Sequence, residues 1–434
     1  MNYQETLDYL FHKLPMFTRI GAAAYKKDLT NTIRLCEALG NPQKKFKSIH
    51  IAGTNGKGST AHMLSAILQT AGYKTGLHTS PHLHDFRERI KIDGKVCDEN
   101  FVIDFTQRIQ PLIDELEPSF FEITVAMAFE YFALQQVDIA VIEVGLGGRL
   151  DSTNVITPEL SIITNIGRDH MNILGDTLEK IAFEKAGIIK SGVPVIVGEY
   201  LAETRPIFDK QAAAFNTPIV YASDKRYVTD FHTGNKQMDV TIADRNTDER
   251  ATYTLDLPGL YQTKNILSVI EAAHQLHKQG WNTTPAIVQK ALPHVKKLAG
   301  LHGRWEVIHE HPVLVLDVGH NEDGIKQIIQ QLELSDYKHL HIVIGMVKDK
   351  EFDNVLKLLP DQASYYFTKA QIPRALDETI LQETALQYNL VGNAYPTVTS
   401  ALEAAVTKSQ KQDMILVCGS VFIVAEVDLS KIKW

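Results

Sequence analysis

The chain has few of the features that mark secreted or membrane proteins. Its 434 residues include only three cysteines, Cys36, Cys97 and Cys418, and none of them lies in a Cys-x-x-Cys pair. A set this sparse and odd in number is typical of a protein kept in a reducing compartment, where thiols are mostly structural. No apolar run approaches the length of a membrane span, and the first residues lack both a basic stretch and a long apolar run. We therefore expect a cytoplasmic protein with no signal peptide and no transmembrane segment.

Positive charge is also in deficit. Lys and Arg number 44 against 52 Asp and Glu, which gives a net charge of −8. This balance argues against general binding to nucleic acid or to an anionic membrane, although local basic groups can still bind an anionic small molecule. The length exceeds what one hydrophobic core usually covers, so we expect two domains, over residues 1–297 and 298–434.

The clearest motif is a glycine-rich stretch between a predicted strand, residues 46–52, and an apolar helical pattern that ends before Gly72. Its residues are Gly53-Thr54-Asn55-Gly56-Lys57-Gly58-Ser59-Thr60. The backbone N–H groups of such a loop and the dipole of the next helix attract phosphate, and Lys57 stands where a terminal phosphate would lie. The strict pattern has Ser or Thr directly after the lysine, so Gly58 makes this a variant loop. The alternative is an ordinary tight turn with a solvent-facing lysine.

Other candidate residues follow other predicted strands. Glu143 closes the apolar run 138–144, which is typical of a buried parallel strand, and an acid at that end is the expected metal ligand beside phosphates. A helix cap or a salt bridge is its alternative role. His170 follows the predicted strand 160–165 and could bind metal, although a lone histidine is more often structural. Ser80 lies in a polar loop after the short strand 74–79, either as part of a site wall or as plain surface.

Strands and helices alternate along most of the chain, which predicts an α/β fold with a doubly wound, mostly parallel sheet. Residues 227–257 are polar and β-rich and predict a small antiparallel appendage, and residues 293–303 are interpreted as an interdomain linker. From Val313 the alternation restarts and predicts a smaller, Rossmann-like C-terminal α/β domain. In the first part helices are predicted at 5–14, 28–39, 120–135, 177–186 and 262–276 and a further strand at 193–197; in the second, strands are predicted at 313–317, 340–345, 363–367 and 414–417 and a helix at 421–427.

Two domains that both carry candidate loops suggest a nucleotide bound in a cleft that closes between them and excludes water. The reaction to be explained uses ATP without losing it to water. Phosphorylation of a carboxylate, followed by attack of an amine on the acyl phosphate, is a reaction of this kind.

Ten short motifs together resemble one known family, the ATP-dependent amide ligases of the Mur ligase superfamily. Within it the chain looks like the folylpolyglutamate synthases, including the forms that are also dihydrofolate synthases. The resemblance covers nearly the whole chain. The motifs are Gly53 to Ser59, Thr79 to Leu83, Glu88 to Ile90, Phe121 to Thr124, Glu143 to Asp151, Asp169-His170, Glu184 to Ile188, Gly303-Arg304, Asp317 to Asn321 and Gly419-Ser420.

The resemblance implies an ATP- and Mg²⁺-dependent ligase that joins L-glutamate to the carboxylate of a folate and releases ADP and phosphate. It implies dihydropteroate as a further acceptor, a monovalent cation such as K⁺ as an additional candidate cofactor, and a monomer. Implied nucleotide contacts are Thr54, Asn55, Gly56, Lys57, Gly58, Ser59, Thr60, Asn265, Arg304, Asp317 and His320. Arg304 would steady the phosphates as their charge shifts. A hydrogen bond that stabilises its own loop is the alternative role of His320.

The resemblance also implies how the reaction is catalysed, with Lys57, His170 and Lys185 as candidate catalytic residues. One Mg²⁺ would be held by Ser59 and Glu143, and a second by Ser80, Glu143 and His170, and the two ions would neutralise the repulsion between carboxylate and phosphate. Lys185 matches a lysine that this superfamily often carbamylates, which would turn an ammonium into an anion that supports the second ion through water. A helix-surface lysine is the alternative.

For the folate, the resemblance implies a pterin lying against Phe121 and near Asp151 and Ser152, with the Asp151 carboxylate accepting pterin N–H groups. The chain departs from the family pattern at three places. Leu301-His302 replaces a common Trp-Pro, and Gly319 replaces a common Ala. Arg168 stands where an apolar residue is usual, and it would lower metal affinity at His170 if it pointed inward.

Two other functions compete with this interpretation. A cell-wall precursor ligase of the same superfamily would carry an additional N-terminal domain for a uridine nucleotide, and only about fifty residues precede the phosphate loop. A non-catalytic P-loop nucleotide-binding protein would read guanine with Asn-Lys-x-Asp, whereas Asn235-Lys236 is followed by Gln237-Met238.

Overall fold

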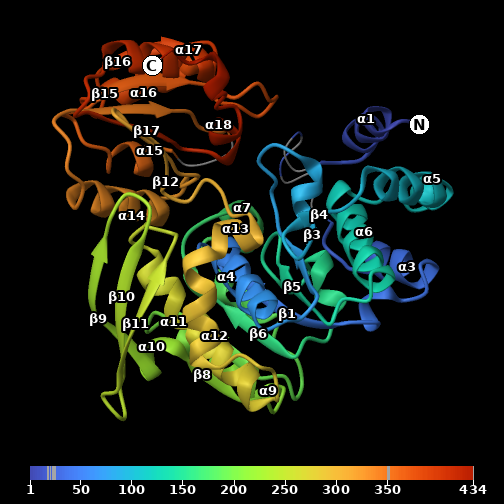
Figure 1. Cartoon of the computed structure of the whole chain (residues 1–434). Coiled ribbons are helices and arrows are strands. Elements are labelled where there is room, and N and C mark those ends of the chain that lie inside the picture. The colour runs from blue at the N-terminus through green and yellow to red at the C-terminus, as the bar shows by residue number, and fades with distance from the viewer. Residues whose placement is uncertain (17–18, 20, 22–25, 349–351, 434) are drawn as a thin grey trace. The chain divides into compact units, whose positions relative to one another are not determined.

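The computed structural model describes residues 1–16, 19, 21, 26–348 and 352–433. The chain divides into two compact units (Figure 1). The first unit comprises Met1–His232, Asp239–Asp256 and Gln262–Leu301, and the second comprises Thr233–Met238, Leu257–Tyr261 and the chain from His302 onward. The predicted domain limit between residues 297 and 298 stays a prediction.

The first unit is built on an eight-stranded sheet with the order β4-β3-β2-β5-β1-β6-β7-β8. All neighbours are parallel except β2–β3 and β3–β4, so the doubly wound, mostly parallel sheet is confirmed. The carboxyl ends of the parallel strands meet at one edge, which is where open α/β sheets bind ligands. The strands are β1 (Lys47–Ala52), β2 (Thr75–His78), β3 (Ile90–Ile92), β4 (Lys95–Val96), β5 (Ile139–Glu143), β6 (Leu160–Ile163), β7 (Val195–Val197) and β8 (Ile219–Tyr221).

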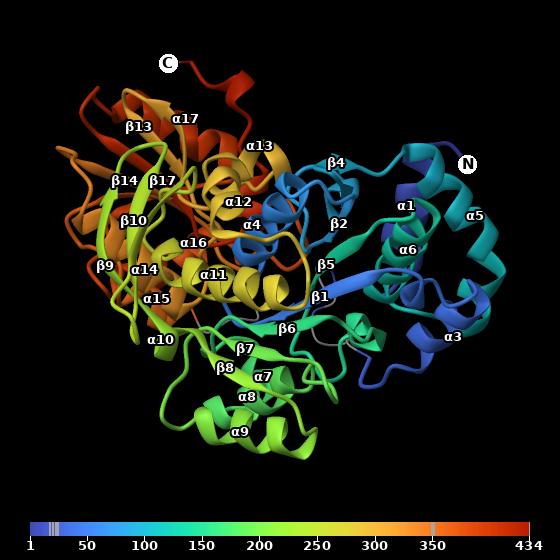
Figure 2. The same cartoon turned by 60° about the horizontal axis from the view of Figure 1, so that its bottom comes forward.

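Helices of the first unit pack on each other in separate groups around this sheet (Figure 2). Helices α11, α12 and α13 pack on α4, whereas α3 packs on α6 and α8 packs on α9. Helix α5 is missing from the sequence prediction, although its apolar residues recur at helical spacing and are buried. The helices are α1 (Tyr3–Lys13), α3 (Thr30–Ala38), α4 (Lys57–Thr70), α5 (Glu99–Leu116), α6 (Phe120–Leu134), α7 (Met171–Leu174), α8 (Leu178–Ala186), α9 (Arg205–Ala214), α10 (Ala222–Lys225), α11 (Gln262–Lys278), α12 (Pro285–Ala291) and α13 (Val295–Ala299).

The limit between the two units, after Leu301, falls inside the predicted linker 293–303, but the segment does not form a free connection. Most of its residues are built into the first unit, where α13 packs on α4. The buried Lys91 of β3 donates from Nζ to the carbonyls of Ala299 (3.1 Å) and Gly300 (2.9 Å), and so holds the end of α13. The proline and glycine at the ends of the segment suggested a linker, but its apolar residues decided how it packs.

The predicted appendage is present as a three-stranded sheet with the order β11-β10-β9. Its strands are β9 (Arg226–Thr233), β10 (Met238–Asp244) and β11 (Arg250–Leu255). The buried side of the sheet carries Met238, Val240 and Ile242 of the central strand.

The second unit has a six-stranded sheet with the order β12-β13-β17-β14-β15-β16. All pairs are parallel except β12–β13, whose register shifts between Val307 and His309. The four predicted strands are confirmed, whereas β12 and β16 were not predicted. The elements are β12 (Glu306–Glu310), β13 (Val313–Leu316), β14 (Leu340–Ile344), β15 (Ser364–Thr368), β16 (Gly392–Tyr395), β17 (Met414–Cys418), α14 (Glu322–Glu333), α15 (Asp353–Leu356), α16 (Glu378–Leu386), α17 (Val398–Lys408) and α18 (Val421–Ala425).

The expected structural role of the cysteines is consistent with the fold, since Cys36, Cys97 and Cys418 are all buried and unbridged. Among the described helices, none combines the length and the apolar character needed to cross a membrane.

Candidate active site

The predicted phosphate loop connects β1 to α4, and the end of β6 fixes its shape. The Thr54 N–H donates to the Asn165 carbonyl (3.1 Å), and the Asn55 N–H donates to Asn165 Oδ1 (2.9 Å). Thr54 Oγ1 also donates to the Gly167 carbonyl at 3.1 Å. Neighbouring parallel strands therefore supply the loop and its support, and sequence reasoning missed the supporting residue Asn165.

Two glycines of the loop cannot be replaced without movement. Gly53 has a φ of 150°, and a Cβ there would lie 1.8 Å from Thr164 Oγ1. Gly56 has a φ of 82°, and its Cβ would lie 2.2 Å from Asn265 Oδ1. Asn265 of α11 is thus packed directly against the loop, at the place where the sequence predicted a nucleotide contact.

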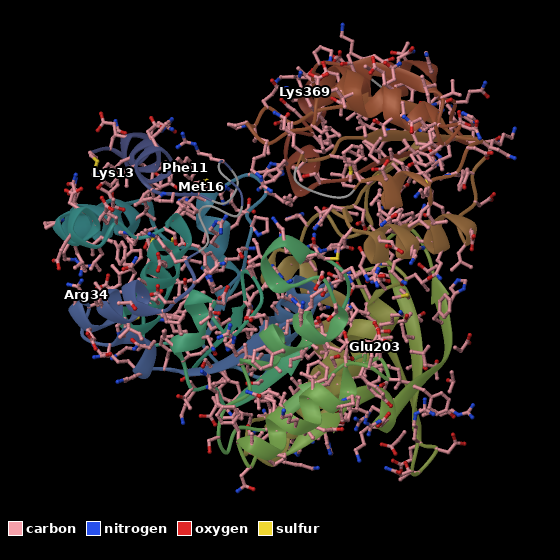
Figure 3. The ribbon with its side chains drawn as sticks, turned by 180° about the vertical axis from the view of Figure 1, so that it is seen from behind. Phe11, Lys13, Met16, Arg34, Glu203 and Lys369 are labelled. Carbon is pink, nitrogen blue, oxygen red and sulfur yellow. The ribbon has the colours of Figure 1, made fainter. Side chains whose placement is uncertain are left out.

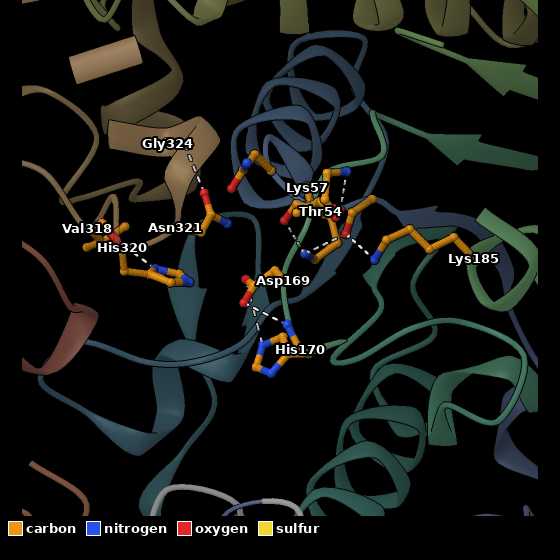
Figure 4. Close-up of polar contacts among 12 residues, drawn as sticks. Thr54, Lys57, Asp169, His170, Lys185, Val318, His320, Asn321 and Gly324 are labelled. Carbon is orange, nitrogen blue, oxygen red and sulfur yellow. Dashed lines mark hydrogen bonds and ion pairs between the residues drawn. The ribbon is translucent and has the colours of Figure 1, made fainter. Parts of the chain in front are cut away.

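Two lysines converge on one carbonyl oxygen of the loop (Figure 4). Lys57 Nζ donates to Gly53 O (2.9 Å) and Thr54 O (3.1 Å), and Lys185 Nζ donates to Gly53 O at 2.9 Å. Lys185 is only 4% exposed, so the alternative of a helix-surface lysine is wrong. Burial, and then the positive charge of Lys57, lower the pKa of Lys185 to about 7. A substantial fraction of this amine is therefore neutral and nucleophilic near physiological pH.

The hydroxyl of Ser59 is reached by a residue that the sequence analysis did not single out. Gln262, the first residue of α11, is fully buried and donates from Nε2 to Ser59 Oγ at 3.1 Å. Asn265 Nδ2 donates in turn to Gln262 Oε1 at 2.8 Å. Helix α11 thus positions both the loop and the Ser59 hydroxyl. Gly58 and Thr60 lie buried in the first turn of α4.

Glu143 and Ser80 come together because β5 and β2 are neighbours in the sheet. Glu143 is the last residue of β5 and is 5% exposed. Its Oε2 accepts a hydrogen bond from the Ser80 N–H at 3.2 Å. A carboxylate and a hydroxyl-bearing residue therefore lie together at the carboxyl edge.

His170 precedes α7 with a left-handed backbone, at a φ of 52°, which is unusual for a residue other than glycine. Its backbone N–H donates to Asp169 Oδ1 at 2.9 Å, and its ring Nε2 lies 3.8 Å from Asp169 Oδ2 (Figure 4). The neighbouring Arg168 is exposed, so it does not have the inward orientation that would oppose a metal ion.

The donor set fits magnesium better than a metal held by the protein alone. Among the described residues, no group of three or more His, Cys, Asp and Glu is placed to hold a metal ion. Ser59, Ser80 and Glu143 offer oxygen ligands with a single carboxylate, and Mg²⁺ typically takes one or two carboxylates and completes its shell with phosphates and water.

The residues assigned to the folate lie around the glycine run after β5. A Cβ on Gly145 would lie 2.4 Å from Phe121 Cζ, so the run lies directly against that ring. Asp151 is buried and shapes the run: its Oδ2 accepts from the Leu146 N–H (2.8 Å), and its Oδ1 accepts from Thr153 N (3.0 Å) and Thr153 Oγ1 (2.5 Å). Ser152 begins the short helix that follows. The two bonds from Thr153 occupy both acceptor sites of Oδ1, so acceptor capacity for a ligand remains on Oδ2.

Three predicted nucleotide contacts belong to the second unit, near the carboxyl end of β13. Asp317 is buried, and its carboxylate accepts hydrogen bonds from the Tyr261 hydroxyl (2.7 Å), Trp305 N (2.8 Å) and Gly319 N (2.8 Å). Burial raises the pKa of Asp317. His320 Nδ1 donates to the Val318 carbonyl at 2.9 Å, which is the loop-stabilising bond considered as its alternative role (Figure 4). Arg304 Nη1 donates to the Gly303 carbonyl at 3.2 Å.

Comparison with known proteins assigns the family. Residues 51–273 match the Mur ligase middle domain, and residues 303–421 match the Mur ligase glutamate ligase domain. The chain is 32% identical over 437 residues to the dihydrofolate synthase/folylpolyglutamate synthase of Bacillus subtilis, with 98% of each chain covered. The chain belongs to the folylpolyglutamate synthase family of Mur ligases. It is therefore an ATP-dependent ligase, and the identification made from the ten motifs is confirmed.

Two further proteins that are similar to the chain allow its length and its fold to be compared. The probable bifunctional folylpolyglutamate synthase/dihydropteroate synthase of Haloferax volcanii is 33% identical, and the chain spans half of its length. The folylpolyglutamate synthase of Mycobacterium tuberculosis, solved with ADP and AMPPCP, has a TM-score of 0.86 at 28% identity, with 98% of both chains covered. The predicted fold class of the first and second units is thereby confirmed.

Proposed function

We propose that the chain joins L-glutamate to the carboxylate of a folate, with ATP converted to ADP and phosphate, and that it also accepts dihydropteroate. The observation that carries this proposal is the match over 98% of both chains to an enzyme named for both activities. The phosphate loop, with its two lysines at one carbonyl, supports the proposal as a site suited to ATP.

In the proposed reaction, an oxygen of the acceptor carboxylate attacks the γ-phosphorus of ATP, and the bond to the β-phosphate oxygen breaks. The amine of glutamate then attacks the acyl carbon, phosphate leaves, and the amine gives up a proton. Lys57 and the backbone N–H groups of the loop would hold the transferring phosphate. A carboxylate and a phosphate repel each other, so positive charge in this position lowers the barrier.

We propose Mg²⁺ ligands at Ser59 and Glu143, and a second set at Ser80, Glu143 and His170. Bound there, Mg²⁺ would neutralise phosphate and carboxylate charge. We propose K⁺ as a further cation to be varied in the assay. The amine of Lys185, with its lowered pKa, is suited to react with carbon dioxide and form a carbamate, which would add negative charge beside the loop. Asn265, Arg304, Asp317 and His320 are proposed as further nucleotide contacts.

We propose that the pterin lies against Phe121, near Asp151 and Ser152. The enzyme is further proposed to be a cytoplasmic monomer, in keeping with three buried thiols and no disulfide among them. Light scattering during gel filtration measures the oligomeric state.

The test is phosphate release from ATP with glutamate present, comparing tetrahydrofolate, dihydropteroate and no acceptor, with the products identified by mass. We expect release with both acceptors. Release with tetrahydrofolate alone would reduce the proposal to polyglutamate synthesis, and release with neither would refute the substrate class.

The control for the phosphate loop is the Lys57→Ala variant, which should lose turnover with every acceptor because it removes the cation beside the transferring phosphate. Activity near that of the wild type would contradict the assignment of Lys57.

A further inference from the structure

The motif Glu88-Arg89-Ile90 contains a buried cation for which the proposed function has no use. Arg89 is the last residue of the short helix Phe86–Arg89, directly before strand β3, and it is 5% exposed. Within the described chain its only hydrogen-bonding side-chain atom is Nε, and no carboxylate lies within ion-pair distance of its guanidinium. Buried charges in proteins are almost always paired, so an unpaired buried guanidinium indicates a missing anion.

The neighbouring carboxylates explain why Arg89 has no ion-pair partner among the described residues. The two carboxylate oxygens of Glu88 accept hydrogen bonds from the backbone N–H groups of Leu83 (2.7 Å), His84 (3.0 Å) and Asp85 (2.9 Å). Glu143 accepts from the Ser80 N–H. Both carboxylates act on Arg89 through their fields without contacting it, and burial lowers its pKa to about 10, where it still carries its charge at neutral pH.

Two contacts orient the guanidinium of Arg89, and a third holds its backbone. Arg89 Nε donates to His82 Nδ1 at 2.8 Å, and the guanidinium carbon lies 5.3 Å from the centre of the Phe120 ring. The Arg89 carbonyl accepts from His78 Nδ1 at 2.9 Å. The His82 ring is itself stacked against Phe11 of α1, a residue labelled in Figure 3. With Nε engaged, the two terminal nitrogens form a fork of the shape that binds a carboxylate with two parallel hydrogen bonds.

The surroundings of Arg89 belong to the proposed acceptor site. Phe120 is adjacent to Phe121, and the His78 ring lies 6.1 Å from the Phe121 ring. Glu143 and Ser80 mark the end of the site where the reacting carboxylate would be activated. A folate that already carries glutamate has a second carboxylate on that residue, close to the reacting one, whereas dihydropteroate has only one carboxylate.

We propose that Arg89 binds the non-reacting carboxylate of the terminal glutamate of a folate and so determines the preference for glutamylated acceptors. This inference rests on the proposed function, because it requires the acceptor to lie between Phe121 and Glu143. Loss of the two terminal nitrogens weakens the binding of glutamylated acceptors and leaves the binding of acceptors without that carboxylate almost unchanged.

The test is equilibrium binding of pteroylglutamate and pteroate, which differ only by the glutamyl group, to the full-length chain. We expect the wild type to bind pteroylglutamate more tightly. The Arg89→Met variant should lower the affinity for pteroylglutamate by about 100-fold and the affinity for pteroate by less than about threefold. Arg89→Lys keeps the charge but not the fork, and should lower the affinity for pteroylglutamate by about tenfold.

The matched control is Arg87→Met. Arg87 lies two residues away but is paired with Asp85 (2.7 Å) and Glu99 (3.5 Å), so its removal should leave both ligands unchanged. Unchanged ADP affinity in every variant shows that the fold is intact. Equal weakening of both ligands, no weakening, or a defect confined to the KM for free glutamate would overturn the role of Arg89. If the wild type binds neither ligand, the proposed substrate class fails and the inference fails with it.

Discussion

The buried amine of Lys185 should lower the free energy of unfolding of the protein. We predict that Lys185→Met raises the free energy of unfolding near neutral pH while it strongly lowers ligase activity. The fall of the Lys185 pKa from 10.5 to about 7 corresponds to about 5 kcal/mol, at about 1.4 kcal/mol for each tenfold change in proton affinity. The variant also loses the hydrogen bond to Gly53 O, which contributes about 1 kcal/mol. The expected net gain is about 4 kcal/mol where the wild-type amine is fully protonated.

The pH dependence of this gain identifies its cause. Between about pH 7 and pH 10.5 the unfolded chain holds a proton on Lys185 that the folded chain does not, so the wild type becomes more stable as the pH rises. The variant lacks this dependence. Its advantage is therefore largest below about pH 7, falls across that window, and disappears above about pH 10.5.

The assay is urea unfolding followed by circular dichroism at several pH values in buffer freed of carbon dioxide, because a carbamate on Lys185 would remove the buried cation. The matched control is Lys180→Met on the same helix, where the lysine side chain is 62% exposed and should contribute little. A Lys185→Met variant that is less stable than the wild type near pH 7, or whose stability difference does not change with pH, would refute the reasoning.

Three other changes test the site. Lys185→Ala should turn over poorly and recover in part when a short carboxylic acid is added, because the acid replaces the carbamate; an unchanged rate would remove Lys185 from the site. Gly145→Ala places a Cβ 2.4 Å from Phe121 Cζ and should raise the KM for folate by about tenfold with ADP affinity unchanged. In the control Gly234→Ala, where the nearest atom is 3.6 Å away, both the KM and the ADP affinity should stay unchanged. Thr153→Val removes the hydroxyl between His50 Nε2 (2.8 Å) and Asp151 Oδ1 (2.5 Å), and should lower the free energy of unfolding by about 2 kcal/mol in urea titrations; a neutral effect would show that this buried chain is not a structural support.

Features that depend on neighbouring residues could be predicted from the sequence. The phosphate loop combines glycines, a lysine and the start of an apolar helix within a few positions, and β5 shows its burial by a continuous apolar run. The loop between β1 and α4 and the strand β5 therefore lie where the sequence predicted them, and parallel pairing of β5 with β1 and β2 explains why their ends share one edge.

Contacts between distant parts of the chain could not be predicted in this way. Gln262 reaches Ser59, and Tyr261 reaches Asp317, only because packing brings their elements together. The residues next to a glutamine or a tyrosine in the sequence form no pattern that predicts such a contact. The burial of Lys185 is of the same kind, since one lysine on the inner face of α8 resembles a surface lysine in sequence. The segment 293–303 contains the limit between the two units, as the sequence predicted, but its apolar residues pack most of it into the first unit.

The outermost strands of the sheets determine how readily one molecule could pair with another. Strand β4 has two residues and includes the exposed Lys95, and β8 at the opposite edge has three. In the second unit, the edge strand β12 has an irregular register. Short, charged or irregular edges offer a foreign strand few backbone groups in line, which protects a sheet from adding strands of another chain and aggregating. An engineer who wished to link two copies through their sheets would have to lengthen one of these edges first.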